Sequence, residues 1–212
     1  MLYKQILDDF SSIPNLKTKD IDQYNKKLIK SKADVSQLGD YILTHKLLHR
    51  TYFQVSLGLM KDFDQQFTFI EENEDYLQDW WHVDQLTQFV KKPIYFDYAF
   101  AKAKKYTASS KTFTRRWGYV LFLTGLQKDP ANTKKILSLM KDDPEYYVQM
   151  AQAWLICDLA VFNPKDTIEF IENSNLKYNI LGKAIQKILD SYRISDSDKA
   201  YVKSLRPKLK EN

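Results

Sequence analysis

The stretch Trp80-Trp81-His82-Val83-Asp84 decides the fold when it is compared with Arg115-Arg116-Trp117 and Ala153-Trp154-Leu155 further along the chain. The spacing of apolar residues predicts that each segment lies in the second helix of a two-helix unit. Trp80 and Arg116 are 36 residues apart, and Arg116 and Trp154 are 38 apart. Helix pairs that repeat at about 35–45 residues are typical of α-solenoids, in which equivalent positions of successive units line one surface. The tryptophans, the aspartate and the arginine are therefore expected to share one concave groove.

Composition favours an all-α fold. The 212 residues include only six Pro and five Gly, and helix-forming residues such as Leu, Lys and Gln are common. No segment alternates apolar and polar residues for long, so no sheet is expected. We predict an α-solenoid, a superhelix of HEAT-like helix pairs with a concave basic groove. Every linker is short, so we expect a single repeat domain over residues 1–212. The alternative, an irregular helical bundle, is disfavoured by the even spacing of the helices.

Helical periodicity and capping residues place the individual helices. The expected inner helices, one per unit, cover residues 47–60, 79–90, 114–124, 147–162 and 180–191. Further helices are expected at residues 2–10, 18–30, 35–43, 63–72, 97–106, 130–140, 165–172 and 196–205, and the helix that contains 147–162 is expected to begin at residue 145.

The chain carries no sign of a membrane or secretory destination. No apolar run approaches the ~20 residues that span a bilayer, and the amphipathic, acidic start at residues 1–9 is unlike a signal peptide. The single cysteine, Cys157, excludes an internal disulfide and fits a reducing compartment. We therefore expect a cytoplasmic protein that does not bind membranes.

Charge is distributed unevenly along the chain, whose formal net charge is +5. Residues 98–127 contain no acidic residue, whereas residues 62–90 contain no Lys or Arg. Basic residues interleaved with aromatic ones suggest contact with phosphates. The alternative is that both runs are simply solvated helix faces. The basic residues that we expect to contact nucleic acid are Lys102, Lys105, Lys111, Arg115, Lys183 and Lys187.

Several short segments, taken as a set, resemble one known family. Trp80 and Asp84 are four residues apart and share a helix face, and they match a W-x-x-x-D pattern. Arg116 precedes a small-apolar run, Trp154 lies in a helix closed by Asn163-Pro164, and residues 183–187 read K-A-I-Q-K. Taken singly, each of these residues is explained by core packing or by a surface charge. Together, from about Ile13 onward, they are similar to the HEAT-like repeat alkylpurine DNA glycosylases, the AlkD-like enzymes of DNA alkylation repair.

The resemblance implies a chemistry as well as a fold. The family cleaves the glycosidic bond of cationic purines, so the sugar passes through an oxocarbenium-like state. By this resemblance Asp84 would stabilise the cation and position the attacking water, Trp80 and Trp154 would hold the sugar and the backbone, and Arg116 would grip a phosphate. The implied partner is duplex DNA, alkylated or branched, bound by a monomer. Neither a cofactor nor a metal is expected.

Three departures from the family pattern lead us to expect a weak grip on DNA and weak activity. Only residues 1–10 precede the turn at residues 11–14, where the family has a longer helical segment. Cys157 stands where the family commonly has an Arg. Asp20 and Asp22 lie beside Lys17 and Lys19. Each lost phosphate contact weakens duplex binding steeply.

Three functions therefore remain open at the level of the sequence. The first is an alkylpurine DNA glycosylase, the second a nearly inactive relative that binds nucleic acid, and the third a protein-interaction solenoid. The retained Trp80, Asp84, Arg116 and Trp154 argue against the third. His45 and His49 are four residues apart, but no third ligand accompanies them, so a metal site is not expected there.

Overall fold

The structure is a computed structural model that describes residues 1–91 and 95–211. Every regular element within these ranges is a helix and none is a strand, which confirms the predicted all-α class. The chain divides into two compact units, Met1–Lys91 (unit 1) and Lys92–Asn212 (unit 2). The superhelix, the concave groove and the single repeat domain over residues 1–212 stay predictions.

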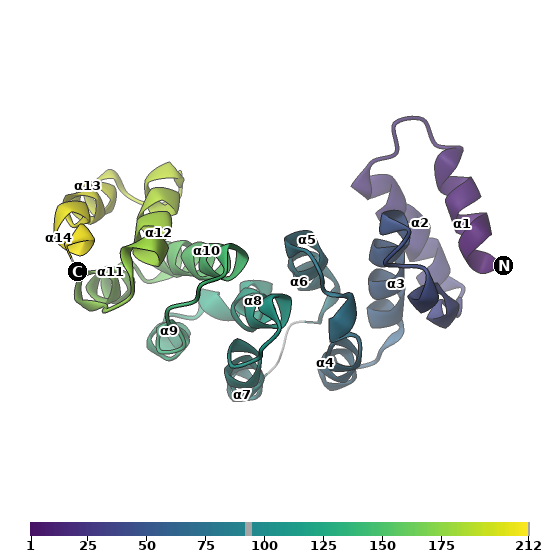
Figure 1. The fold of residues 1–212 in the computed structure, drawn as a ribbon, viewed down its shortest axis with the longest axis horizontal. Helices are drawn as coiled ribbons and strands as arrows, with labels where there is room; N and C mark the ends of the chain where they lie inside the picture. Colours follow the sequence, from purple (N-terminus) through teal and green to yellow (C-terminus); the bar gives the residue numbers. More distant parts are fainter. Residues whose placement is uncertain (92–94, 212) are drawn as a thin grey trace. The chain divides into compact units, whose positions relative to one another are not determined.

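Unit 1 is organised around its third α-helix. Its elements are α1 (Leu2–Ser11), α2 (Thr18–Lys30), η1 (Ser36–Asp40), α3 (Lys46–Leu59), α4 (Phe63–Glu72), η2 (Glu74–Tyr76), α5 (Trp80–Asp84) and α6 (Leu86–Phe89). Helices α1, α2 and α6 and the 3-10 turn η1 all pack on α3 (Figure 1). The side chains of Leu48, Phe53 and Val55 on α3 are fully buried, so α3 supplies the centre of the core of this unit.

Local capping explains why several helices begin where the sequence predicts. The Asp62 carboxylate accepts a hydrogen bond from Gln65 N at 2.9 Å and starts α4. The Asp20 carboxylate accepts from Lys17 N at 2.9 Å at the start of α2. The predicted helices at residues 18–30 and 63–72 are confirmed without change.

Two predictions in unit 1 were wrong in detail. The continuous helix expected at residues 79–90 is broken at Gln85 into α5 and α6. The buried side chain of Gln85 bonds to His49 and Arg50, and the Thr87 hydroxyl donates to Asp84 O at 2.7 Å. The helix expected at residues 35–43 is only the 3-10 segment η1.

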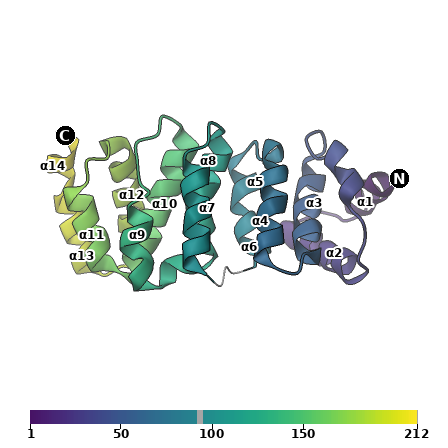
Figure 2. The same cartoon turned by 90° about the horizontal axis from the view of Figure 1, so that it is seen from below.

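In unit 2, helices α7 to α12 form two rows. Its elements are α7 (Phe96–Thr107), α8 (Thr112–Val120), η3 (Leu121–Thr124), η4 (Leu126–Lys128), η5 (Pro130–Asn132), α9 (Thr133–Leu137), α10 (Tyr146–Phe162), α11 (Pro164–Asn173), α12 (Tyr178–Asp190), α13 (Asp196–Ser204) and α14 (Arg206–Lys210). Helices α8, α10 and α12 form one row and α7, α9 and α11 the other (Figures 1 and 2). Consecutive members of the first row pack on each other, and α7 also packs on α8 and α11 on α10. This arrangement is consistent with an α-solenoid.

Helix α10 is apolar on every side and is correspondingly buried. Ala151, Leu155 and Leu159 are fully buried, and Cys157, which is 8% exposed, is a core residue as well. Burial raises the pKa of the Cys157 thiol to about 11. Asp158, also buried, accepts a hydrogen bond from Gln127 Nε2 at 2.7 Å and pairs with the Arg193 guanidinium.

In the part of the chain that the structure describes, no helix has both the length and the apolar character to cross a membrane.

The contact between α7 and α8 depends on Gly118. A Cβ at this position would lie 2.7 Å from Thr107 Cγ2 and 2.9 Å from Thr107 N, and the backbone cannot move aside as a side-chain tip can. We expect Gly118→Ala to lower the free energy of unfolding by about 1–3 kcal/mol through overpacking. The cost of overpacking is expected to exceed the ~1 kcal/mol by which Ala is favoured over Gly inside a helix.

Urea denaturation measures this effect, with Gly182→Ala as the matched helical control. The three atoms nearest to a Cβ at position 182 all belong to the partly exposed ring of Tyr178, the first of them at 3.0 Å, and this side chain can rotate away. Equal stability of the Gly118→Ala variant and the unmodified protein would contradict the close packing of α7 on α8.

Candidate functional site

The unit 1 residues of the predicted site lie at the two ends of one short helix. Helix α5 begins at Trp80, whose N–H donates to the Asp79 carboxylate at 2.7 Å, and ends at Asp84. The Trp80 side chain is 46% exposed, and Asp84 is partly buried. Because the two residues are four apart in a helix, they share a face. An exposed indole and a carboxylate are thus presented together.

Trp81 packs inward instead. Its ring meets His49 edge-on, with centroids 5.2 Å apart, and also contacts His82 at 4.0 Å. The His49 and His82 rings stack almost in parallel, 3.7 Å apart at 10°. One indole of the Trp80-Trp81 pair is therefore exposed, and the other covers a pair of buried histidines.

Hydrogen bonds fix the proton positions in this histidine pair. His49 Nε2 lies 3.1 Å from Tyr76 O, and a carbonyl only accepts, so Nε2 carries the proton. His49 Nδ1 then accepts from Gln85 Nε2 at 2.9 Å, and His82 Nδ1 accepts from Gln78 N at 3.1 Å. Burial lowers the pKa of His49 to about 3 and that of His82 to about 4. Both rings are therefore neutral at pH 7 and pack on each other as uncharged aromatic groups.

The polar layer continues from Gln85 to the second helix of the chain. Gln85 Oε1 accepts from Arg50 Nη1 at 3.3 Å. Arg50 Nε and Nη2 hold the Asp22 carboxylate at 2.7 and 2.9 Å. The charge of Asp22 is thus compensated within the fold, and Asp20 serves as the cap of α2. Both acidic residues that weakened the expected phosphate contacts near Lys17 therefore have structural roles.

The unit 2 residues of the predicted site lie on α8 and α10. Arg116 is only 5% exposed, and its Nη1 donates to Tyr147 O in the first turn of α10. Trp154 lies in the middle of α10 and is partly buried. Tyr147 and Trp154 are seven residues apart and share a helix face. Arg116 is thus joined to the helix that carries Trp154.

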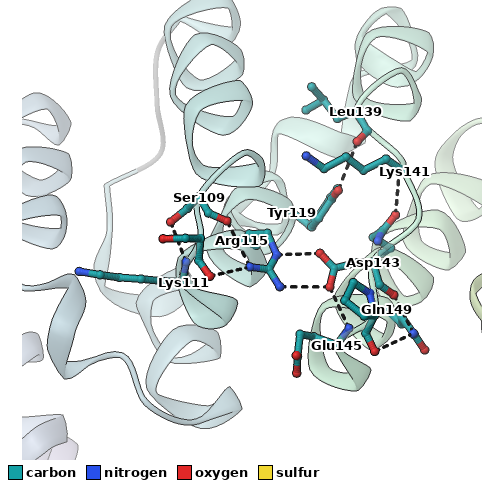
Figure 3. A network of polar contacts seen from close by, with 12 residues as sticks. Ser109, Lys111, Arg115, Tyr119, Leu139, Lys141, Asp143, Glu145 and Gln149 are labelled. Carbon is teal, nitrogen blue, oxygen red and sulfur yellow. Dashed lines mark hydrogen bonds and ion pairs between the residues drawn. The ribbon is translucent and has the colours of Figure 1, made fainter.

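Arg115 is tied to the loop that precedes α10 (Figure 3). Its Nε and Nη2 grip the Asp143 carboxylate in a bidentate pair at 2.7 and 3.2 Å. Its Nη1 donates to Ser109 O and Ser110 O at 3.1 and 2.9 Å. A contact between Arg115 and a phosphate, as predicted, would have to compete with this partly buried ion pair.

The lysines predicted to contact nucleic acid all belong to unit 2. Lys183 Nζ donates to Gln149 Oε1 at 2.9 Å and to Asn179 O at 2.8 Å, and Lys187 lies one turn further along α12. Lys102 Nζ is 5.7 Å from the centroid of the Tyr98 ring. Lys105 near the end of α7 and Lys111 at the N-cap of α8 are exposed.

Sequence reasoning missed a group of residues at the start of α10. Tyr146 and Tyr147 are 57% and 39% exposed. Gln149 donates to Asp143 O (Figure 3) and accepts a hydrogen bond from Lys183 Nζ. The signal in the sequence that could have identified this group is the pair of adjacent tyrosines, Tyr146 and Tyr147, at the start of a mostly apolar helix.

The structure thus brings together Trp80 with Asp84 in unit 1, and Arg116 with the helix of Trp154 in unit 2. The convergence of these two pairs in one groove stays a prediction. Among the described residues, no group of three His, Cys, Asp or Glu side chains is arranged to hold a metal ion.

Comparison with protein families identifies the class of protein. A model of the family described as DNA alkylation repair enzyme matches residues 11–188, which include parts of both units and all four residues of the predicted site. The chain therefore belongs to the DNA alkylation repair enzyme family, which confirms the resemblance seen in the sequence. Comparisons with curated proteins and with solved structures found no match. Membership supports a role in alkylation repair and an interaction with DNA.

The buried histidine pair predicts how stability depends on pH. In the unfolded chain each ring takes up a proton near pH 6.5, whereas the folded protein resists protonation down to about pH 4 for His82 and about pH 3 for His49. The contribution of the two histidines to the free energy of unfolding is therefore fully present above about pH 6.5. It is lost progressively as the pH falls below that value. The loss is about 1.4 kcal/mol per pH unit for each histidine.

The measurement is the free energy of unfolding from pH 7.5 to 4.5. We expect the His49→Gln/His82→Gln variant to show a slope reduced by the contribution of both rings, whatever its stability at pH 7. The exposed His45 provides the control, since His45→Gln should keep the original slope. A double variant with an unchanged slope would rule out neutral burial of the pair.

Proposed function

We propose that this protein is an AlkD-like DNA glycosylase that releases cationic alkylpurines from DNA and acts as a monomer. The observation that carries the proposal is the family match over residues 11–188. This span includes a helix that presents the exposed Trp80 indole beside the Asp84 carboxylate. Cationic purines are good leaving groups, so the proposal includes neither a metal nor a cofactor.

In the proposed reaction the bond between the purine and C1′ of the sugar breaks, and the purine leaves as a neutral base. The positive charge moves to the sugar, which becomes an oxocarbenium-like cation. The Asp84 carboxylate stabilises this cation and orients the water that adds to C1′, and the water releases its proton to solvent. The faces of Trp80 and Trp154 hold the sugar and its backbone through the negative side of their ring quadrupoles.

Arg116 is proposed to orient a phosphate from the α8–α10 side of unit 2. Its bond to Tyr147 O holds the guanidinium against the first turn of α10, and a guanidinium is a group that can recognise phosphate in bidentate pairs. Its burial leaves little of that guanidinium surface open, however, and Arg115 is paired with Asp143. We therefore propose weak duplex binding and slow base release.

Base release tests the proposal. We expect the protein to release 7-methylguanine or 3-methyladenine from alkylated duplex DNA, and Asp84→Asn to slow the release on the order of 10²–10³-fold, as loss of a charge-stabilising group does. Asp97→Asn is the matched control, because Asp97 is an exposed carboxylate paired with Lys135 on the surface. Equal release by the Asp84→Asn variant would remove Asp84 from the mechanism.

Salt dependence tests the phosphate contacts. The logarithm of the duplex association constant should fall linearly with the logarithm of the salt concentration. Each of Lys183→Gln and Lys187→Gln should reduce the steepness of this slope by about 0.9. The control is Lys128→Gln, at an exposed lysine on η4, which should leave the slope unchanged. An affinity independent of salt would contradict a phosphate-binding surface on α12.

A second candidate function is nucleic-acid binding without catalysis. It is favoured because Arg116, which would orient the damaged nucleotide for catalysis, is buried, whereas Lys105 and Lys111 are exposed and can contact phosphates without catalysis. The two candidates differ in one result: only the first predicts base release that depends on Asp84.

A further inference from the structure

The first turn of α10 presents aromatic rings to solvent. Tyr146 and Tyr147 are 57% and 39% exposed, and their ring centroids lie 5.4 Å apart at 75°. The ring of Phe113 on α8, which is partly buried, lies beside them, with its centroid 5.8 Å from that of Tyr147. Exposed large aromatic side chains that cluster in this way mark an interaction surface more often than scattered ones do. We call Phe113, Tyr146 and Tyr147 the aromatic platform.

The platform is held firmly by its surroundings. Tyr147 O accepts the hydrogen bond from Arg116, and α10 packs on both α8 and α12. The Lys183 ammonium stands 5.6 Å from the centroid of the Tyr146 ring. Its bonds to Gln149 Oε1 and Asn179 O fix it there. A cation is thus kept beside exposed aromatic faces.

This combination suits unpaired nucleotides. Every nucleobase has a π-face that can stack on an aromatic side chain, and a neighbouring cation meets the phosphates. In a duplex the faces of the bases are stacked on one another, so only unpaired or terminal bases can use such a platform. We propose that Phe113, Tyr146 and Tyr147, together with Lys183, bind unpaired nucleotides of single-stranded DNA.

The proposal rests on the proposed function only in taking DNA as the polymer. The binding that it predicts needs neither a damaged base nor Asp84.

The acidic residues around the platform limit where the phosphates can lie. The Asp143 carboxylate is paired with Arg115, and Asp142 accepts a hydrogen bond from Lys177 N at 2.9 Å. Glu145, at the N-cap of α10, is exposed and repels phosphates. The backbone of the bound strand is therefore placed on the side of Lys183. Glu145→Gln should raise the affinity at low salt.

The test compares three undamaged DNA ligands by fluorescence anisotropy: an oligothymidylate of about a dozen nucleotides, a blunt hairpin duplex, and the same hairpin with an unpaired tail. We expect the tailed hairpin to bind more tightly than the blunt one. Tyr146→Ala/Tyr147→Ala should weaken oligothymidylate binding on the order of 5- to 150-fold for each base that loses its stacking partner. The tailed and blunt hairpins should then bind alike.

Controls separate stacking from other effects. Tyr192→Ala, at a tyrosine that is 94% exposed elsewhere in unit 2, should leave binding unchanged. Tyr146→Phe/Tyr147→Phe keeps the rings and should keep the affinity. All three ligands are undamaged and the readout is binding rather than base release, so a failure of the glycosylase proposal leaves this test intact. Thermal unfolding followed by circular dichroism shows whether the variants are folded. If the Tyr146→Ala/Tyr147→Ala variant is unfolded, Tyr146→Ala alone replaces it in the test.

Three results would overturn the proposal. The first is equal binding of the tailed and blunt hairpins by the unmodified protein. The second is a Tyr146→Ala/Tyr147→Ala variant that binds oligothymidylate as tightly as the unmodified protein. The third is tighter binding of an RNA of the same length and base sequence, which would remove DNA as the partner.

Discussion

The burial of α10 is the constraint on which the rest of unit 2 depends. A helix with apolar residues on all its sides must be covered along most of its length, and beyond its exposed first turn α10 is covered by α8, α11 and α12. Its few buried polar side chains are used for bonds between elements: Asp158 reaches η4 and Arg193, and Gln149 reaches Lys183. Because α10 is fixed in this way, the positions of the residues on its surface are fixed too.

In both units, polar side chains next to the site residues hold those residues in place. In unit 1 the stacked rings of His49 and His82 lie under Trp81, and Gln85 connects them to the pair formed by Arg50 and Asp22. In unit 2 the Arg115–Asp143 pair joins α8 to the loop before α10 (Figure 3). Sites whose supporting side chains are fixed by packing and hydrogen bonds hold their geometry more closely than sites on free loops.

Much of the fold could be predicted from the sequence because helix signals are local. Asp62 and Asp20 cap helices within three residues of themselves, so α2 and α4 were predicted with correct ends. The break at Gln85 could not be predicted, since the partner of its side chain, His49, is 36 residues away. The same holds for Arg116, which is buried and donates to Tyr147 O, 31 residues further along the chain. The sequence likewise does not reveal that the Asp143 carboxylate accepts hydrogen bonds from Arg115, 28 residues before it.

The central claim of the proposed function is the prediction that Asp84 and Arg116 act on the same nucleotide. A double-mutant cycle on the rate of 7-methylguanine release tests this most directly, with the conservative changes Asp84→Glu and Arg116→Lys so that rates stay measurable. If both residues act in one site, the two effects should be coupled by about 0.5–3 kcal/mol. Effects that add to within about 0.3–0.5 kcal/mol would show two independent residues and would contradict a shared site.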